Sequence, residues 1–181
     1  MLVEARLADA LGISRTPLRE ALQRLEGEGW LRKTANRSFQ VREVDLREYL
    51  QSVKVREMLE PEAAMLAAGA ISAERLHAIR HSVTELGNPE QHTDAHWRSD
   101  DEVHGVYLDA CGNPVLADTI RLLRNATRLF EITRLSDRVA ADAREHLVIV
   151  DALASEDRRQ IRRAVQAHLK SLVRFSLATV A

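Results

Sequence analysis

The chain has 181 residues, the size of one or two small domains, and 45% of them are hydrophobic, which is enough to bury a core. Aromatic residues make up only 4%, and glycine and proline are few, so the composition favours helices over sheets. A single cysteine, Cys111, excludes an internal disulfide and a cysteine-based zinc site. No apolar run reaches the roughly 18 residues that span a bilayer, so we expect a cytoplasmic protein.

The charge is unevenly placed along the chain. Its overall value of −1 argues by itself against a nucleic-acid partner. Residues 1–42, however, carry eight lysines and arginines against five acids, a net charge of +3, which leaves −4 on the remainder. A basic head on an acidic body indicates a polyanionic partner for the head alone.

Two short helices are predicted at the start of the chain. Residues 2–11 place Leu7 and Leu11 at i, i+4 spacing, and Gly12 can end this helix. A second helix begins after Ser14, whose hydroxyl can cap it, and ends at one of the glycines at positions 27 and 29. Its inward stripe is expected to consist of Leu18, Ala21, Leu22 and Leu25.

A β-ribbon is predicted after these helices. Trp30-Leu31 and Phe39-x-Val41 are short apolar stretches on either side of the polar segment TANRS, which is typical of a turn. Two helices joined by a tight turn and followed by such a ribbon form a winged helix-turn-helix. We therefore expect a winged helix-turn-helix DNA-binding domain in residues 1–43.

Six helices are predicted for the rest of the chain, where strand signals are absent. Breakers such as ISAE, GNPEQ and CGNP separate them. The expected ranges are 45–69, 72–86, 93–111, 114–135, 138–154 and 157–179. The sequence therefore predicts a mostly α fold, in which an antiparallel all-helical bundle of residues 45–181 follows the head.

Arginines stand at the leading end of the second helix. Arg15 and Arg19 are i, i+4 neighbours away from the leucine stripe, so both can enter a DNA major groove together. The planar guanidinium matches the paired acceptors of guanine, and Thr16 can add a backbone or methyl contact. The alternative is a solvated helix face held by ion pairs, and the pattern alone leaves it open.

The stretch LADALGISRTPLREALQRLEGEGW, followed by NRSFQV, resembles the DNA-binding domain of GntR-family transcription regulators. The signature of that family runs LA-x-x-LG-hydrophobic-SRTP-hydrophobic-REAL-x-RLE-x-EG, and it matches nearly every position from Leu7 to Gly29. Family members contact the operator through the residues at Arg15, Thr16 and Arg19. The resemblance implies the same roles for these three residues.

The head also departs from the family pattern. The family has another helix before the position of Met1, so the resemblance implies an N-terminally incomplete domain. Family members often have an arginine at the position of Ala5 and a glycine at the wing tip, at the position of Ser38. We expect a groove or phosphate contact to be missing at each of these two positions.

Helical periodicity separates the seven histidines into inward and outward groups. His77 and His81 fall opposite the apolar stripe of their helix and are expected in solvent. Four polar residues of three other helices fall on inward stripes, namely Asp100, His104, His146 and His168. A buried carboxylate and buried imidazoles are costly unless paired, and one shared metal ion would satisfy them all. Hydrogen-bonded core histidines are the alternative.

The body resembles the FCD effector domain of the FadR-like branch of the same family. The matching pieces are REMLEPEAAMLAA, DDEVHGVYLDACGNPVL, REHLVIVDALASED and AVQAHL. Six helices resemble its VanR-type subgroup. In metal-binding FCD domains the ligands correspond to Asp100, His104, His146 and His168, the same set that the inward stripes indicate.

One oxygen and three nitrogens leave room on a five- or six-coordinate ion for water or an effector carboxylate. Zinc is expected first, with nickel or manganese as alternatives, because these ligands do not select among divalent ions. Arg56 projects toward the same interior and can clamp an organic acid bidentately, although a salt bridge to Glu60 is equally compatible with the spacing. Asn125 and Arg128 are weaker candidates for the same pocket.

These observations predict a one-component bacterial transcriptional regulator, either a repressor or an activator, and not an enzyme. A homodimer would place two heads on a palindromic operator, and an organic acid bound near the metal would change the affinity for DNA. Two alternatives stay open. A metal-dependent hydrolase or lyase would use the open position of the ion to activate water. A ligand-binding dimerisation module would carry a vestigial head.

Overall fold

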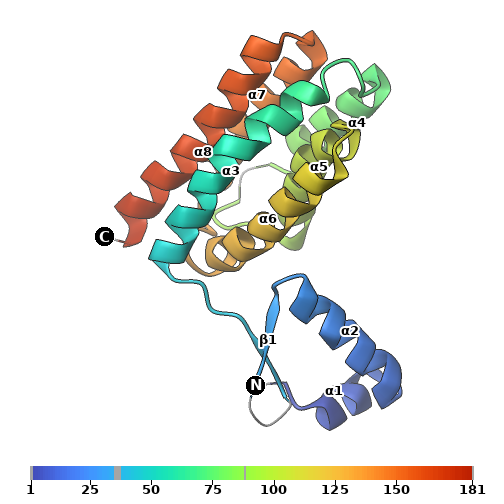
Figure 1. Ribbon diagram of the computed structural model, residues 1–181. Helices are drawn as coiled ribbons and strands as arrows, with labels where there is room; N and C mark the ends of the chain where they lie inside the picture. The colour runs from blue at the N-terminus through green and yellow to red at the C-terminus, as the bar shows by residue number, and fades with distance from the viewer. Residues whose placement is uncertain (1, 35–37, 88, 181) are drawn as a thin grey trace.

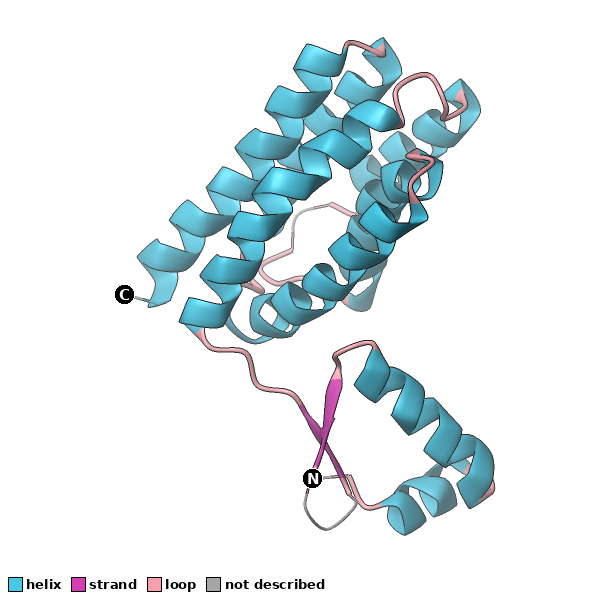
Figure 2. Ribbon diagram, in the orientation of Figure 1, coloured by secondary structure: helices cyan, strands magenta, loops and turns pink. Residues whose placement is uncertain are grey.

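The computed structural model describes residues 2–34, 38–87 and 89–180. Within these ranges it contains eight helices and two short strands, in the predicted order (Figures 1 and 2). A small N-terminal head is followed by a helical bundle, and the extended residues 42–45 join them. The predicted fold class, a mostly α protein with a winged helix-turn-helix head, is confirmed.

The head contains helices α1 (Glu4–Leu11) and α2 (Arg15–Gly27) and strands β1 (Leu31–Lys33) and β2 (Phe39–Val41). The strands pair antiparallel, with Leu31 opposite Val41. Gly12 ends α1 with a left-handed φ of +64°, which glycine adopts without strain. The small core of the head consists of Ala8, Leu18, Leu22, Leu31 and Phe39. The expected tip between the strands includes positions 35–37, which lie outside the described residues.

Two expectations for α2 are corrected. Leu18 and Leu22 are buried as predicted, but Ala21 and Leu25 are exposed, because α1 and β1 pack on only one side of α2. Ser14 occupies the N-cap position with extended backbone, yet its hydroxyl makes no capping bond with the described residues. The predicted stripe was therefore too wide, and the predicted cap is present in backbone geometry only.

The bundle consists of the six predicted helices, with ends that differ from the expected ones by at most three residues. Side chains of Asp45, Ser72 and Asn113 accept backbone N–H groups and so cap three of the helices. The helices are α3 (Leu46–Leu66), α4 (Ala73–Glu85), α5 (Asp94–Ala110), α6 (Pro114–Arg134), α7 (Val139–Ser155) and α8 (Arg158–Val180).

The bundle is organised around α3, which packs against α6 and α8, while α7 packs against α4 and α8. One continuous core of aliphatic and aromatic side chains fills the space between these helices. The predicted outward histidines, His77 and His81, are exposed. None of the helices within the described ranges is long and apolar enough to cross a membrane.

A candidate metal centre and a candidate nucleic-acid interface

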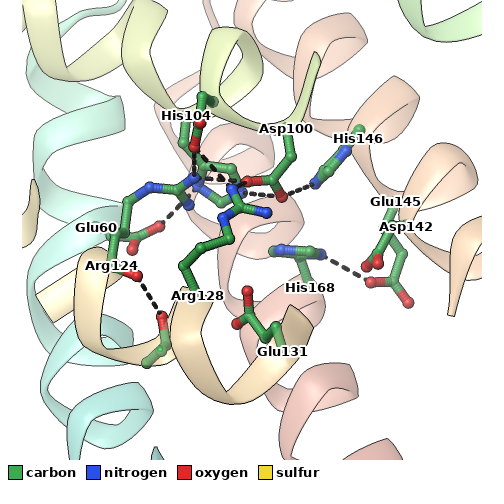
Figure 3. Close-up of polar contacts among 12 residues, drawn as sticks. Glu60, Asp100, His104, Arg124, Arg128, Glu131, Asp142, Glu145, His146 and His168 are labelled. Carbon is green, nitrogen blue, oxygen red and sulfur yellow. Dashed lines mark hydrogen bonds and ion pairs between the residues drawn. The ribbon is translucent and has the colours of Figure 1, made fainter. Parts of the chain in front are cut away.

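The four predicted metal ligands come together inside the bundle. Asp100 and His104 lie on α5, His146 on α7 and His168 on α8 (Figure 3). The three imidazoles are buried, their ring centroids lie 5.0 to 5.4 Å apart, and one nitrogen of each lies within 4.8 Å of the others. The inward stripes of three helices therefore meet at one point.

Two of the imidazoles are oriented by carboxylates behind them. Nδ1 of His104 lies 3.1 Å from Oε2 of Glu60, which also accepts the hydroxyl of Tyr107 at 2.7 Å. Nδ1 of His168 lies 2.8 Å from Oε2 of Glu145. A carboxylate on one ring nitrogen fixes the tautomer and directs the other nitrogen toward a metal ion. This arrangement is typical of histidine ligands.

Two buried nitrogens face this point without a partner. Across the described residues, Nε2 of His104 and Nε2 of His146 have no hydrogen-bond partner. An unpaired polar atom in a protein interior is costly, and a cation placed between the rings would remove that cost for both. The donor set, three imidazoles and one carboxylate, suits zinc, nickel and manganese. The residues present therefore fit a divalent ion.

Asp100 uses its two oxygens differently. Oδ1 lies 3.4 Å from Nε2 of His146 and 3.9 Å from Nε2 of His104. Oδ2 accepts hydrogen bonds from Arg124, at 2.7 Å, and from Arg128. Burial alone raises the pKa of Asp100, but the guanidiniums of Arg128 and Arg124 outweigh it and hold the pKa well below the usual range. Asp100 is therefore a carboxylate at neutral pH.

Two of the imidazoles, those of His104 and His168, are neutral at the same pH. Burial lowers the pKa of His104 well below its usual value, although Glu60 opposes the shift. Burial likewise lowers the pKa of His168 to about 4 against the opposing effect of Glu145. A neutral imidazole keeps a lone pair free for a metal ion, so no proton has to leave these rings when an ion binds.

A small cavity adjoins the ligands. Its free space is about 10 Å³, room for one water molecule. Arg56 lies on its wall and makes the predicted salt bridge, with Nε 2.6 Å from Oε1 of Glu60, while its Nη1 donates to Thr127 at 2.7 Å. A second buried arginine, Arg138, also lines the cavity. The cavity therefore has two arginines on its wall together with Asp100 and His168.

The other two predicted effector residues lie on α6 in different surroundings. Arg128 donates to Asp100 and Asp101 and stacks on Trp97, with its Cζ 4.5 Å from the ring centroid. Asn125 instead reaches the head, where its Nδ2 donates to the carbonyl oxygen of Glu28 at 2.9 Å. The structure thus brings Arg56 and Arg128 to the ligands and gives Asn125 a contact between the domains.

Sequence reasoning missed several residues of this site. Arg138 precedes α7 and donates to Asp142, Glu145 and Ser171, and Arg124 holds Asp100 from another helix. Their partners are distant in sequence or belong to a helix end, so periodicity gives no signal for them. Glu145 was detectable, because it directly precedes an inward histidine.

The predicted DNA-binding residues form an exposed surface at the start of α2. The side chains of Arg15, Thr16 and Arg19 are all exposed. Nε and Nη2 of Arg19 donate to Oε2 of Glu4 at 3.1 and 2.8 Å, so α1 holds this guanidinium in place. The ion pair expected under the alternative, a solvated helix face, is therefore present, and its partner is Glu4 on α1.

Comparison with known proteins gives two matches that together cover most of the chain. Residues 1–41 match the gntR family of bacterial regulatory proteins, and residues 51–171 match the FCD domain. The Nta operon transcriptional regulator of Aminobacter aminovorans is 30% identical over 169 residues, which cover 92% of this chain and 80% of that protein. YdhC of Bacillus subtilis (strain 168), an uncharacterized HTH-type transcriptional regulator, is 25% identical over 91% of this chain and 76% of its own length.

Solved structures share the fold. E. coli McbR/YncC has a TM-score of 0.74 and 21% sequence identity, with 99% of this chain and 88% of that chain covered. A putative transcriptional regulator GntR from Rhodococcus sp. RHA1 has a TM-score of 0.73 and 18% identity, with 98% and 86% covered. Both likenesses extend over the head and the bundle together.

Proposed function

The chain belongs to the gntR family of bacterial regulatory proteins and carries an FCD domain, and we propose that a small organic acid bound beside a metal ion controls its affinity for DNA. Its relatives are transcriptional regulators and not enzymes, so the hydrolase or lyase alternative is set aside. The head of residues 1–43 would bind the operator, and the body of residues 45–181 would bind the ion and the effector. Such a protein acts in the cytoplasm, where the chromosome lies.

One observation supports the part of the proposal that concerns binding of a metal ion and an effector in the body. Three buried imidazoles and one ionised carboxylate from three helices converge, and two of the imidazole nitrogens have no hydrogen-bond partner among the described residues. Asp100, His104, His146 and His168 would hold the ion. Zinc is the first choice, with nickel or manganese as alternatives. The ion would supply a positive centre to which an effector carboxylate can bind.

The chain's own residues would recognise the acid. Arg56 and Arg138 lie on the wall of the adjoining cavity, and guanidiniums bind carboxylates with two parallel hydrogen bonds. The present free space of about 10 Å³ is smaller than any organic acid, so binding requires side chains to move. A ligand that binds one conformation better than another shifts the equilibrium between them, and this is the basis of regulation here.

The head would read DNA through α2. Arg15, Thr16 and Arg19 are exposed at the start of this helix, as major-groove recognition requires. In a homodimer, two such helices would contact the half-sites of a palindromic operator.

Operator selection tests the proposal. Purified protein would select duplexes from a random-sequence DNA library, and the affinity for the selected duplex would be measured at several salt concentrations. We expect a palindromic consensus, a steep loss of affinity with salt, and a change in affinity when zinc chloride and then a panel of small carboxylic acids are added. Absence of any selected consensus would support the dimerisation module with a vestigial head.

A further inference from the structure

A groove separates the head from the bundle. Its volume is about 670 Å³, and Glu28 and Trp30 line it from the head while residues of α5 and α6 line it from the bundle. Asn125 Nδ2 crosses the groove and donates to the carbonyl oxygen of Glu28 at 2.9 Å. Beside it, Leu122 approaches Gly29 so closely that a Cβ on this glycine would lie 3.4 Å from Cδ1 of Leu122. We call these two contacts the docking contact.

The docking contact reaches the end of the helix that we propose reads DNA. Glu28 is the C-cap residue of α2, and Gly29 follows it with a left-handed φ of +82°. A side chain at position 29 would be strained by this φ, and its Cβ would lie in van der Waals contact with Leu122. The backbone turn at the end of α2 is therefore shaped to lie against α6.

The same turn of α6 also holds the candidate metal ligand Asp100. Arg124 and Arg128 flank Asn125 in sequence, and both donate to Oδ2 of Asp100 (Figure 3). Its other oxygen, Oδ1, faces the imidazoles of His146 and His104. One carboxylate thus joins the candidate metal centre to the part of α6 that carries the docking contact.

We propose that Asn125 is a positioning residue that transmits the state of the metal centre to the DNA-binding head. A cation held by the imidazoles would share the carboxylate of Asp100 with Arg124 and Arg128 and so weaken their hold on it. Because α6 is one continuous helix, a shift of these arginines moves Asn125 with them. The inference rests on the proposed function, since it needs an ion at the centre and a head that binds DNA.

Loss of the Asn125 hydrogen bond should have a moderate and measurable effect on the docking of the head. A neutral hydrogen bond contributes enough to change the population of the docked arrangement about fivefold. Coupling between two sites in regulatory proteins commonly changes affinity by about five- to 150-fold. Loss of the Asn125 bond is therefore sufficient to remove a regulatory response at the lower end of this range.

Single-molecule energy transfer between the two domains tests the inference. Dyes would be attached to cysteines at the exposed positions Gln23 and His77, in a Cys111→Ala background. The full-length protein would be freed of metal with a chelator and then titrated with zinc chloride. We expect one narrow distance distribution for the reference protein without zinc, and a shift of that distribution with zinc.

Asn125→Ala and Asn125→Asp should broaden the distribution and abolish the zinc-dependent shift, because both lose the amide donor. Zinc affinity, measured by competition with a chelating dye, should change by no more than about fivefold, because coupling between two sites is reciprocal and the lost hydrogen bond changes the docked population by about that factor. The control is Asp118→Asn on the same helix, which lines the same groove and contacts Arg121. It should keep the shift.

Three results would overturn the inference: a zinc-dependent shift that persists in Asn125→Ala, an equal loss in Asp118→Asn, or zinc binding without any shift in the reference protein. Failure of the reference protein to bind zinc, nickel or manganese in the same competition would contradict the proposed function itself, and the inference with it. Competition with the chelating dye therefore distinguishes failure of this inference from failure of the proposed function.

Discussion

A single carboxylate, Asp100, faces two kinds of partner. Its Oδ1 lies near two imidazoles, and its Oδ2 receives two guanidiniums. The sequence predicted the first role from the inward stripe of α5. It gave no indication of the second, because Arg124 and Arg128 belong to another helix whose position depends on the tertiary fold.

Asp100→Asn should destabilise the protein by about 3 kcal/mol, because it leaves the largely buried guanidiniums of Arg124 and Arg128 with only the exposed Asp101 as a counter-charge. The matched control is Asp101→Asn, since the side chain of Asp101 is 66% exposed and contacts the same two arginines. It should cost about 0.5 kcal/mol or less, because water screens exposed ion pairs. Urea unfolding of the metal-free variants measures both. If the two variants lost the same free energy of unfolding, Asp100 would not be the main counter-ion of these arginines.

Glu4 should set how accurately Arg19 reads DNA. Its carboxylate holds the guanidinium from the side, which leaves the outer edge for a base. Glu4→Gln should reduce discrimination between the selected operator and unrelated DNA about tenfold. Non-specific affinity should rise, because a negative charge near the phosphates is removed.

The control for this prediction is Glu28→Gln, which breaks the exposed Arg24–Glu28 ion pair at the other end of α2. Competition binding with labelled duplexes measures both variants. Unchanged discrimination in Glu4→Gln, or an equal change in Glu28→Gln, would contradict a role for Glu4 in orienting Arg19.

The buried imidazoles should make the metal-free protein acid-sensitive. The pKa of His168 is lowered by burial from 6.5 to about 4, and that of His104 is lowered for the same reason. Between these values the unfolded chain binds protons that the folded chain does not, so stability is full above pH 6.5 and falls as the pH drops toward 4. Urea midpoints from pH 7 to 4.5 measure this decline.

The slope of the unfolding free energy against pH measures how many more protons the unfolded chain binds than the folded chain. His168→Gln should lower this number by about one, because one of the titrating groups is gone. His77→Gln, at an exposed position, should leave the slope unchanged. A reference protein whose midpoint does not change over this range would show that the imidazoles titrate normally.

At the scale of the elements, local signals predicted nearly all of the secondary structure. Six bundle helices lie within three residues of their expected ends, because breakers and capping residues mark where each one begins and stops. The stripe of α2 was predicted too wide, since the pattern cannot show that only one side of this helix is covered. Residues that contact the candidate ligands or their carboxylate partners, such as Glu60 and Arg138, could not be predicted in this way. Their positions are set by which helices pack together, and periodicity does not reveal the packing.

Asp45 and Ser14 both occupy N-cap positions, but only one of them caps its helix through its side chain. The side chain of Asp45 accepts the backbone N–H of Glu48 at 2.7 Å, whereas Ser14 makes no such bond with the described residues. Asp45→Ala should therefore cost about 1 kcal/mol, and Ser14→Ala a few tenths at most. Thermal unfolding by circular dichroism measures both. A larger loss for Ser14→Ala would contradict the capping geometry at the start of α2.

At the scale of the whole molecule, two motifs in the sequence predicted the order of head and body. The contact between the two parts was not predictable, because Asn125 and Glu28 are 97 positions apart. Glu28 belongs to the motif of the head, but that motif does not indicate which residue of the body it meets. Asn125 was assigned to the effector pocket from its helix alone. Its position between the domains makes it the residue through which the two halves of the molecule are best connected.

The central claim is that one metal ion is held inside the bundle by the converging histidines and Asp100. Elemental analysis of protein purified without chelators tests it most directly, with an exposed-histidine control, His77→Ala/His81→Ala. The account predicts about one divalent ion per chain in the native protein and in this control, and almost none in His146→Ala/His168→Ala. Full metal content in the His146→Ala/His168→Ala protein would contradict it.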